Sequence, residues 1–209
     1  MNFKFLRKWQ NIAFLLFVVV FMAGIGGGVF YILDWGGHSL PVTGQVVNFT
    51  ATDISGKQVS LNSLNGKVRL VTWFYTNCPD ECPLTAAQME QIQNKLEQQG
   101  EFGKDVVFVS MTLDPTRDTL PVIRSWSAHF HPNLQDWYFV RATPQETLKV
   151  LTQSGVKVQQ ASNPVYLDHI LKTELIDQYG NIRVTYNTAD LNVNQVVSDI
   201  NNLISRSHL

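Results

Sequence analysis

The chain has 209 residues, of which 44% are hydrophobic and 16% charged, a composition typical of a globular protein and not of a disordered one. Its formal net charge is −1 and it carries no basic stripe, which argues against a nucleic-acid-binding protein. The length fits one ordinary domain and a short additional segment.

The first element in chain order is an uncharged apolar run over residues 12–33. As a helix, this run would be about 33 Å long, close to the hydrocarbon thickness of a bilayer. A cleaved signal peptide would have a shorter apolar core and a small-residue cleavage site, and a lipoprotein signal would need a cysteine just after the run. A buried core helix is rarely so long and free of charge. We therefore expect a single transmembrane anchor.

Basic residues flank this run on one side only. Lys4, Arg7 and Lys8 precede it, and the next basic residue is Lys57. The positive-inside rule therefore predicts that residues 1–11 are cytoplasmic and that the remainder of the chain lies on the outer face. Because no Arg- and Ser-rich transit peptide precedes the anchor, we expect the plasma membrane of a bacterium, not a mitochondrial membrane.

A Gly- and Pro-containing linker at 34–44 leads to one domain at 45–209, in which strand-like and helix-like stretches alternate. The expected strands are 46–51, 58–61, 68–75, 106–113, 137–141, 167–176 and 182–186. The expected helices are a segment ending at 99 with Leu84, Ala87, Ile92 and Leu96 on one face, then 120–130, 144–154 and 191–205. This order predicts an α/β, thioredoxin-like fold: a central mixed sheet flanked by helices, with an N-terminal hairpin extension.

The two cysteines, Cys78 and Cys82, lie four residues apart where a buried strand leads into a helix. A helix N-terminus favours a thiolate, and residues four apart face the same way. The pair is therefore a structural disulfide, a redox dithiol or a soft-metal site, and so short a disulfide loop would add little stability. Asp80 and Glu81 between the cysteines raise thiol pKa values and attract cations, which favours a metal without deciding the question.

Two thiolates suit Cu(I) or zinc, but a structural zinc site needs four ligands and the chain has no further cysteine. A site completed by one imidazole therefore suits copper better. His38 lies in the linker and His208 in the C-terminal tail. Spacing alone leaves His129, His131 and His169 as three candidate ligands.

Three segments together resemble the Sco/SenC family. Residues 76–83 (TNCPDECP) resemble its CxxxCP motif, and residues 112–119 (TLDPTRDT) resemble its TLDPxRDT segment. Residues 166–169 (YLDH) resemble the segment that carries the family's metal-binding histidine. The three occur in the family's order, and the resemblance covers the domain from about residue 45 onward.

The resemblance implies a membrane-tethered, thioredoxin-fold metallochaperone that assists assembly of the copper centre of cytochrome c oxidase subunit II. Cys78 and Cys82 would be thiolate ligands of a copper ion and His169 its imidazole ligand. Asp80 and Asp168 would orient ligands or tune charge. The expected partners are subunit II and either another copper carrier or a thiol reductant.

The alternative is an enzyme: a thiol–disulfide oxidoreductase whose redox-active Cys78 and Cys82 keep the cysteines of an oxidase subunit reduced. Redox chemistry alone has no evident need for His169, which separates the two hypotheses. A thiol peroxidase is disfavoured because Val71 and Tyr75 replace the Pro and Thr of the peroxiredoxin PxxxTxxC pattern. A structural module held by one disulfide remains the non-catalytic alternative. Copper delivery requires no turnover of a small substrate.

Overall fold

The computed structural model describes residues 16–26, 28, 39–156, 158–160, 167–169, 172–188 and 191–207. The chain divides into two compact units, Met1–Ser39 and Leu40–Leu209.

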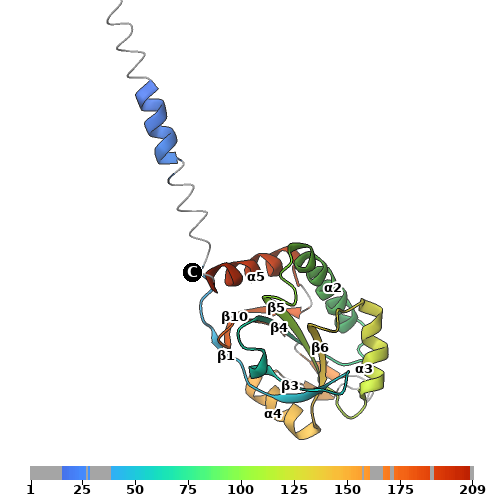
Figure 1. The fold of residues 1–209 in the computed structure, drawn as a ribbon. Coiled ribbons are helices and arrows are strands. Elements are labelled where there is room, and N and C mark those ends of the chain that lie inside the picture. Colours follow the sequence, from blue (N-terminus) through green and yellow to red (C-terminus); the bar gives the residue numbers. More distant parts are fainter. Residues whose placement is uncertain are drawn as a thin grey trace, which may run out of the picture. The chain divides into compact units, whose positions relative to one another are not determined.

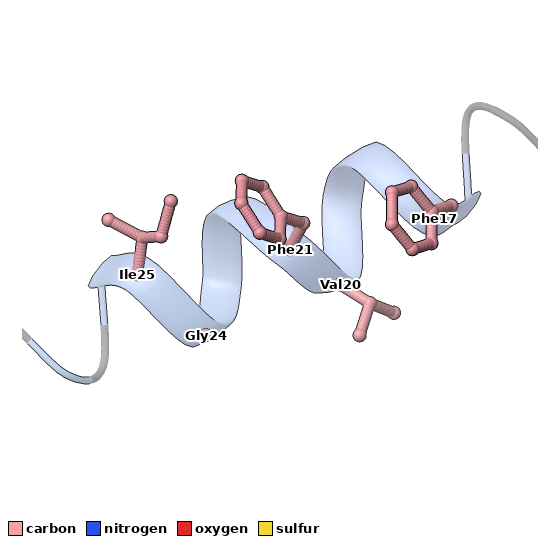
Figure 2. Close-up of a pocket in the computed structure, with 5 residues that line it drawn as sticks. All are labelled: Phe17, Val20, Phe21, Gly24 and Ile25. Carbon is pink, nitrogen blue, oxygen red and sulfur yellow. The ribbon is translucent and has the colours of Figure 1, made fainter.

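In the first unit, residues 16–26 form a helix whose side chains are all exposed. A pocket on this helix is lined by Phe17, Val20, Phe21, Gly24 and Ile25, whose positions Figure 2 shows. The rings of Phe17 and Phe21 stack with their centroids 6.1 Å apart. Within the described ranges, no helix combines the length and the apolar character that a membrane crossing requires. The remaining parts of the predicted anchor lie outside those ranges, so the anchor stays a prediction.

The second unit alternates strands and helices (Figure 1). Its strands are β1 (Gly44–Gln45), β2 (Thr50–Asp53), β3 (Gln58–Ser60), β4 (Val68–Phe74), β5 (Val106–Thr112), β6 (Trp137–Arg141), β7 (Val158–Gln160), β8 (Leu167–His169), β9 (Lys172–Ile176) and β10 (Asn181–Asn187). Its helices are α2 (Glu81–Gln99), α3 (Leu120–Ser127), α4 (Pro144–Ser154) and α5 (Val193–Ser207), with short 3-10 turns η1 (Leu61–Leu64) and η2 (Ala128–Phe130).

Eight strands form one mixed sheet in the order β1-β10-β9-β4-β5-β6-β2-β3. The pairs β4–β5 and β5–β6 are parallel, whereas β4–β9, β9–β10, β2–β6 and β2–β3 are antiparallel. Helices α2 and α5 lie side by side on one face, and α4 lies on the other side of the sheet (Figure 1). The predicted mixed sheet flanked by helices is confirmed, with the β2–β3 hairpin joined to its edge. Strands β7 and β8 pair separately.

The core lies around β4 and β5, in which all seven residues of each strand are buried. Parallel strands covered by helices on both faces favour apolar side chains, and both segments are accordingly mostly apolar, with Arg69, Thr72, Ser110 and Thr112 as their buried polar residues. Near the end of β4, the ring of Phe74 stacks on that of Trp126 in α3, with the ring centroids 4.9 Å apart. The same ring meets Phe139 of β6 edge-on, with the centroids 5.9 Å apart. This aromatic cluster supports the sheet end from which the cysteine segment leaves.

Local chemistry sets the ends of two helices. Thr143 caps α4 by accepting a hydrogen bond from the Glu146 amide at 3.2 Å, and Pro144 occupies the first turn, where no amide donor is needed. Helix α2 ends at Gly100, whose φ of 74° lies in the left-handed region that glycine adopts without steric cost. The predicted helix at 144–154 is confirmed with the same bounds.

Three predicted details are wrong. The strand expected at 46–51 is β2 at Thr50–Asp53; residues 46–49 form no strand, because they connect β1 at one edge of the sheet to β2 near the other. Leu84 does not share the buried face of α2, because the stripe that meets the sheet runs through Cys82, Thr85, Met89 and neighbouring positions and leaves Leu84 50% exposed. The predicted strand 167–176 is two strands: β8 pairs with β7, and β9 pairs with β4 and β10. A strand-like segment in the sequence does not reveal such a change of partner.

Asp177 closes the turn between β9 and β10, and it gives the fold a testable pH dependence. Its carboxylate accepts hydrogen bonds from the side-chain amide of Asn181 (2.9 Å), from the backbone amides of Asn181 (2.9 Å) and Tyr179 (3.0 Å), and from Arg183 (2.9 Å). Burial pushes the pKa of this carboxyl up, but these hydrogen bonds outweigh it and hold the pKa below its usual value.

A depressed folded-state pKa stabilises the fold above the unfolded-state pKa, about 4, and this contribution is lost as the pH falls through the folded-state pKa. We expect Asp177→Asn to lower the free energy of unfolding by about 1–3 kcal/mol at pH 7 and to flatten its decline below pH 4. Denaturant titrations from pH 3 to pH 7 measure both effects. Parallel pH profiles for the two chains would contradict this role of Asp177.

Candidate metal and dithiol site

The candidate site lies where two parallel strands end. Strands β4 and β5 run in register with Phe74 opposite Thr112, and the amide of Leu113 donates to the carbonyl of Phe74 at 2.7 Å. The segment after β4 carries Cys78, and the segment after β5 is the loop 113–119. Ligand sites of open α/β sheets form at this carboxyl edge, because the following loops converge there.

The two cysteines meet at the start of α2. The amide of Cys78 donates to the carbonyl of Tyr75 at 3.2 Å, which closes a turn directly after β4. The amide of Cys82, in the first turn of α2, donates to the sulfur of Cys78 at 3.3 Å. Both residues are thiols, so the interpretation as a formed structural disulfide has no support here. The structure therefore brings both predicted cysteines to one point.

The two thiols differ in environment. Cys78 is 7% exposed, whereas Cys82 is 1% exposed and borders a small cavity that is also lined by Met89, Trp126 and Phe139. The hydrogen bond with Cys78 and burial both raise the pKa of the Cys82 thiol. The Cys82 thiol therefore ionises less readily than an ordinary cysteine. Such a pair can lose two electrons and two protons to form a disulfide, or release its protons to water while the thiolates bind a soft metal ion.

Asp118 ties the cysteine segment to the loop 113–119. Its carboxylate accepts hydrogen bonds from the Thr76 amide at 3.2 and 3.3 Å, from the Thr76 hydroxyl at 2.5 Å and from the Thr112 hydroxyl at 2.5 Å. The residue is 1% exposed. Burial raises the pKa of this carboxyl, and the hydrogen bonds to Thr112 and Thr76 oppose that rise. One carboxylate thus joins the ends of both central strands.

The loop 113–119 also has supports of its own. The amide of Asp114 donates to the Thr112 hydroxyl at 3.0 Å, and Arg117 forms an ion pair with Asp114. From β6, Arg141 donates to the carbonyl of Pro115 at 2.8 Å. The loop therefore keeps its shape through contacts that do not involve the Asp118 carboxylate.

The predicted histidine is placed only in part. His169 is the last residue of β8, opposite Val158 of β7, and its side chain lies outside the described part of the chain, as does that of Asp168. Among the side chains that are described, no three His, Cys, Asp or Glu residues gather closely enough to hold a metal ion. The set of Cys78, Cys82 and His169 therefore stays a prediction.

The other histidine candidates have partners away from the cysteines. His129 contacts the carbonyl of Trp126 at 3.0 Å, and His131 contacts Glu90 on α2 at 3.0 Å. Asp80, the residue before α2, is exposed and its side chain does not cap the helix. Met111 is fully buried in β5, as core packing requires.

Sequence reasoning missed Asp118 and Thr76 as a linked pair. The available signal was a Thr-Arg-Asp-Thr segment at 116–119, separated by three residues from the end of a buried strand, which marks a polar loop near a strand end. Their hydrogen bonds span 42 residues, however, so no local spacing connects them.

A mixed sheet with helices on both faces and two thiols at its carboxyl edge defines a thioredoxin-like protein with a dithiol site. Residues 42–205 match the model of the SCO1/SenC family, and the chain belongs to that family. The SCO1 protein homolog of Bacillus subtilis is 26% identical over 163 residues, which cover 77% of this chain and 83% of that protein.

Two solved structures are also similar. BsSco, a member of the Sco family of cytochrome c oxidase assembly proteins in which a disulfide switch was identified, has 26% identity and a TM-score of 0.69 over 79% of this chain and 96% of its own. Copper-bound ScoI of Arabidopsis thaliana has 24% identity and a TM-score of 0.67 over 77% of this chain and 98% of its own. The predicted family and the predicted thioredoxin-like fold are confirmed.

Proposed function

We propose that the chain is a copper-binding metallochaperone that assists assembly of the copper centre of cytochrome c oxidase subunit II. The observation that carries the proposal is the hydrogen bond from the Cys82 amide to the Cys78 sulfur, which holds two soft donors together at the sheet's carboxyl edge. Two thiolates select a soft cation such as Cu(I). Membership of the SCO1/SenC family and the likeness to a copper-bound ScoI support the same cargo.

In this proposal Cys78 and Cys82 bind copper as thiolates and His169 supplies an imidazole nitrogen. The chain docks on its target and passes the ion on by ligand exchange. Because both thiols must lose their protons, copper affinity falls as the pH is lowered. A disulfide between the cysteines removes both donors, so an oxidised chain carries no copper.

We further propose that residues 12–33 anchor the chain in a bacterial plasma membrane, with the domain on the outer face. Eleven consecutive residues of this run, 16–26, form a helix whose side chains are apolar or glycine and exposed, a surface that suits lipid better than water. The basic residues Lys4, Arg7 and Lys8 support a cytoplasmic N-terminus.

The second candidate function is a thiol–disulfide oxidoreductase that reduces the cysteines of an oxidase subunit. The close pairing of the two thiols supports it, because a dithiol reductant forms a disulfide between its own two cysteines; Cys78, the less buried of the two, would be the attacking cysteine. The disulfide switch described for the related BsSco is chemistry of the same kind.

Copper titration separates the two functions. The full-length chain, purified in mild detergent and reduced under anaerobic conditions, is titrated with Cu(I) against a chromophoric chelator. We expect one tightly held copper per reduced chain, none after oxidation of the cysteines, and recovery on renewed reduction. His169→Ala should weaken the complex at least about tenfold, since a ligand contributes no less than an outer-shell partner.

The matched control for His169→Ala is His131→Ala. His131 contacts Glu90 and should leave the affinity unchanged. A folded and fully reduced chain that binds no copper would refute the metallochaperone proposal and leave the oxidoreductase. Equal weakening by both histidine variants would remove His169 from the ligand set.

A further inference from the structure

The hydrogen bonds of Asp118 to the cysteine segment reach Thr76, two residues before Cys78. Two of its donors belong to Thr76, whose amide lies 3.2 and 3.3 Å from the two carboxylate oxygens and whose hydroxyl lies 2.5 Å from one of them. Thr76 stands inside the turn that the Cys78 amide closes on the carbonyl of Tyr75. Holding both donors of Thr76 fixes the direction in which this turn leaves β4.

The loop that contains Asp118 does not need the carboxylate for its own shape. The Asp118 amide donates to the Asp114 carbonyl at 2.9 Å, and Arg141 holds the Pro115 carbonyl at 2.8 Å. The buried side chain instead spans the gap between the two strand ends. On the β5 side this carboxylate accepts a hydrogen bond from the Thr112 hydroxyl, and on the β4 side it holds the turn that contains Cys78.

We propose that Asp118 is a positioning residue for the dithiol, acting through Thr76 to fix Cys78 against Cys82. The inference rests on the proposed function and adds to it a residue that touches neither sulfur. An ionised carboxylate suits this task because it only accepts hydrogen bonds, and all the groups it meets here are donors. Asparagine keeps the volume but turns one acceptor into a donor, so it preserves only part of the contact.

Copper affinity of the reduced full-length chain tests the proposal. Asp118→Ala should lower the affinity for Cu(I) about 10- to 100-fold, the usual effect of losing a group that orients a ligand, and Asp118→Asn should lie between it and the native chain. The matched control is Asp177→Asn, a buried carboxylate with comparable hydrogen bonds in the turn between β9 and β10. It should bind copper within about twofold of the native chain although it is less stable.

A double-mutant cycle tests the route through Thr76. Thr76→Val removes the hydroxyl donor, and we expect Thr76→Val combined with Asp118→Ala to lose no more affinity than Asp118→Ala alone. If the losses of copper affinity in the two single variants multiply in the double variant, the two residues act independently. That result would overturn the proposed action of Asp118 through Thr76. If the folded Asp118→Ala chain binds Cu(I) within twofold of the native chain, the proposal is overturned. If that variant does not fold, the Cu(I) affinities of Asp118→Asn and Thr76→Val decide instead.

The alkylation rate of Cys78 provides a readout that needs no copper. Release of the turn should change this rate several-fold in Asp118→Ala and leave it unchanged in Asp177→Asn. A native chain that fails to bind copper would refute the metallochaperone function, and the alkylation rates would then decide the positioning role alone. Equal rates in native and Asp118→Ala chains would overturn that role.

Discussion

Cys78→Ala and Cys82→Ala should each abolish tight copper binding in a chain that remains folded. Each change removes one of two soft donors that the structure brings together, and a single thiolate with one imidazole cannot replace them. The loss should exceed the roughly 100-fold that follows removal of an outer-shell partner. Neither substitution should unfold the domain, because each removes a single sulfur atom, at a cost of about 1 kcal/mol.

Cu(I) competition on the two variants and on Cys78→Ser and Cys82→Ser measures the effect, with thermal unfolding of the apo-chains recorded alongside. Serine is the matched replacement: it keeps nearly the volume of cysteine and offers a hard oxygen in place of a soft sulfur. Alanine and serine should therefore fail equally. Native affinity in either serine variant would mean that sulfur at that position is not a ligand.

Much of the fold could be predicted because its central segments carry strong local signals. The mostly apolar segments of β4 and β5 are buried from end to end, and Thr143 and Pro144 mark the start of α4. What failed depends on tertiary partners. Leu84 belongs to an apolar pattern along α2 but points away from the sheet, and the split between β8 and β9 follows from pairing with β7.

The candidate site also has residues that local sequence could predict and residues that depend on tertiary contacts. Cys78 and Cys82 could be predicted as a pair because only three residues separate them, although Cys78 lies in the turn before α2 and not on the helix itself. Asp118 could not, since its link to Thr76 exists only after β4 and β5 have paired in register. The assignment of His169 depended on family resemblance, because spacing alone could not choose it over His129 and His131.

Cys78 should react with iodoacetamide at least about tenfold faster than Cys82 in the reduced native chain. Both accessibility and ionisation act in this direction: Cys82 is the more buried, and its contact with Cys78 raises the pKa of its thiol, so less of it is thiolate at pH 8 than of an ordinary cysteine. Mass spectrometry of a sub-stoichiometric reaction locates the label. Raising the pH should increase the share on Cys82.

In denaturant the preference for Cys78 should disappear, since it depends on the folded structure. Equal labelling of the two cysteines in the native chain would contradict the asymmetry.

The order in which the two cysteines react assigns their roles in either function. As a reductant, the Cys78 thiolate attacks a target disulfide and releases one target thiolate. The Cys82 thiolate then attacks the Cys78 sulfur and releases the second target thiolate. Cys78 and Cys82 are thereby oxidised to a disulfide, and the two electrons they lose reduce the target disulfide. As a copper carrier, the same burial makes Cys82 the last sulfur to let the ion go. In both proposed functions, therefore, Cys78 exchanges its partner first and the more buried Cys82 last.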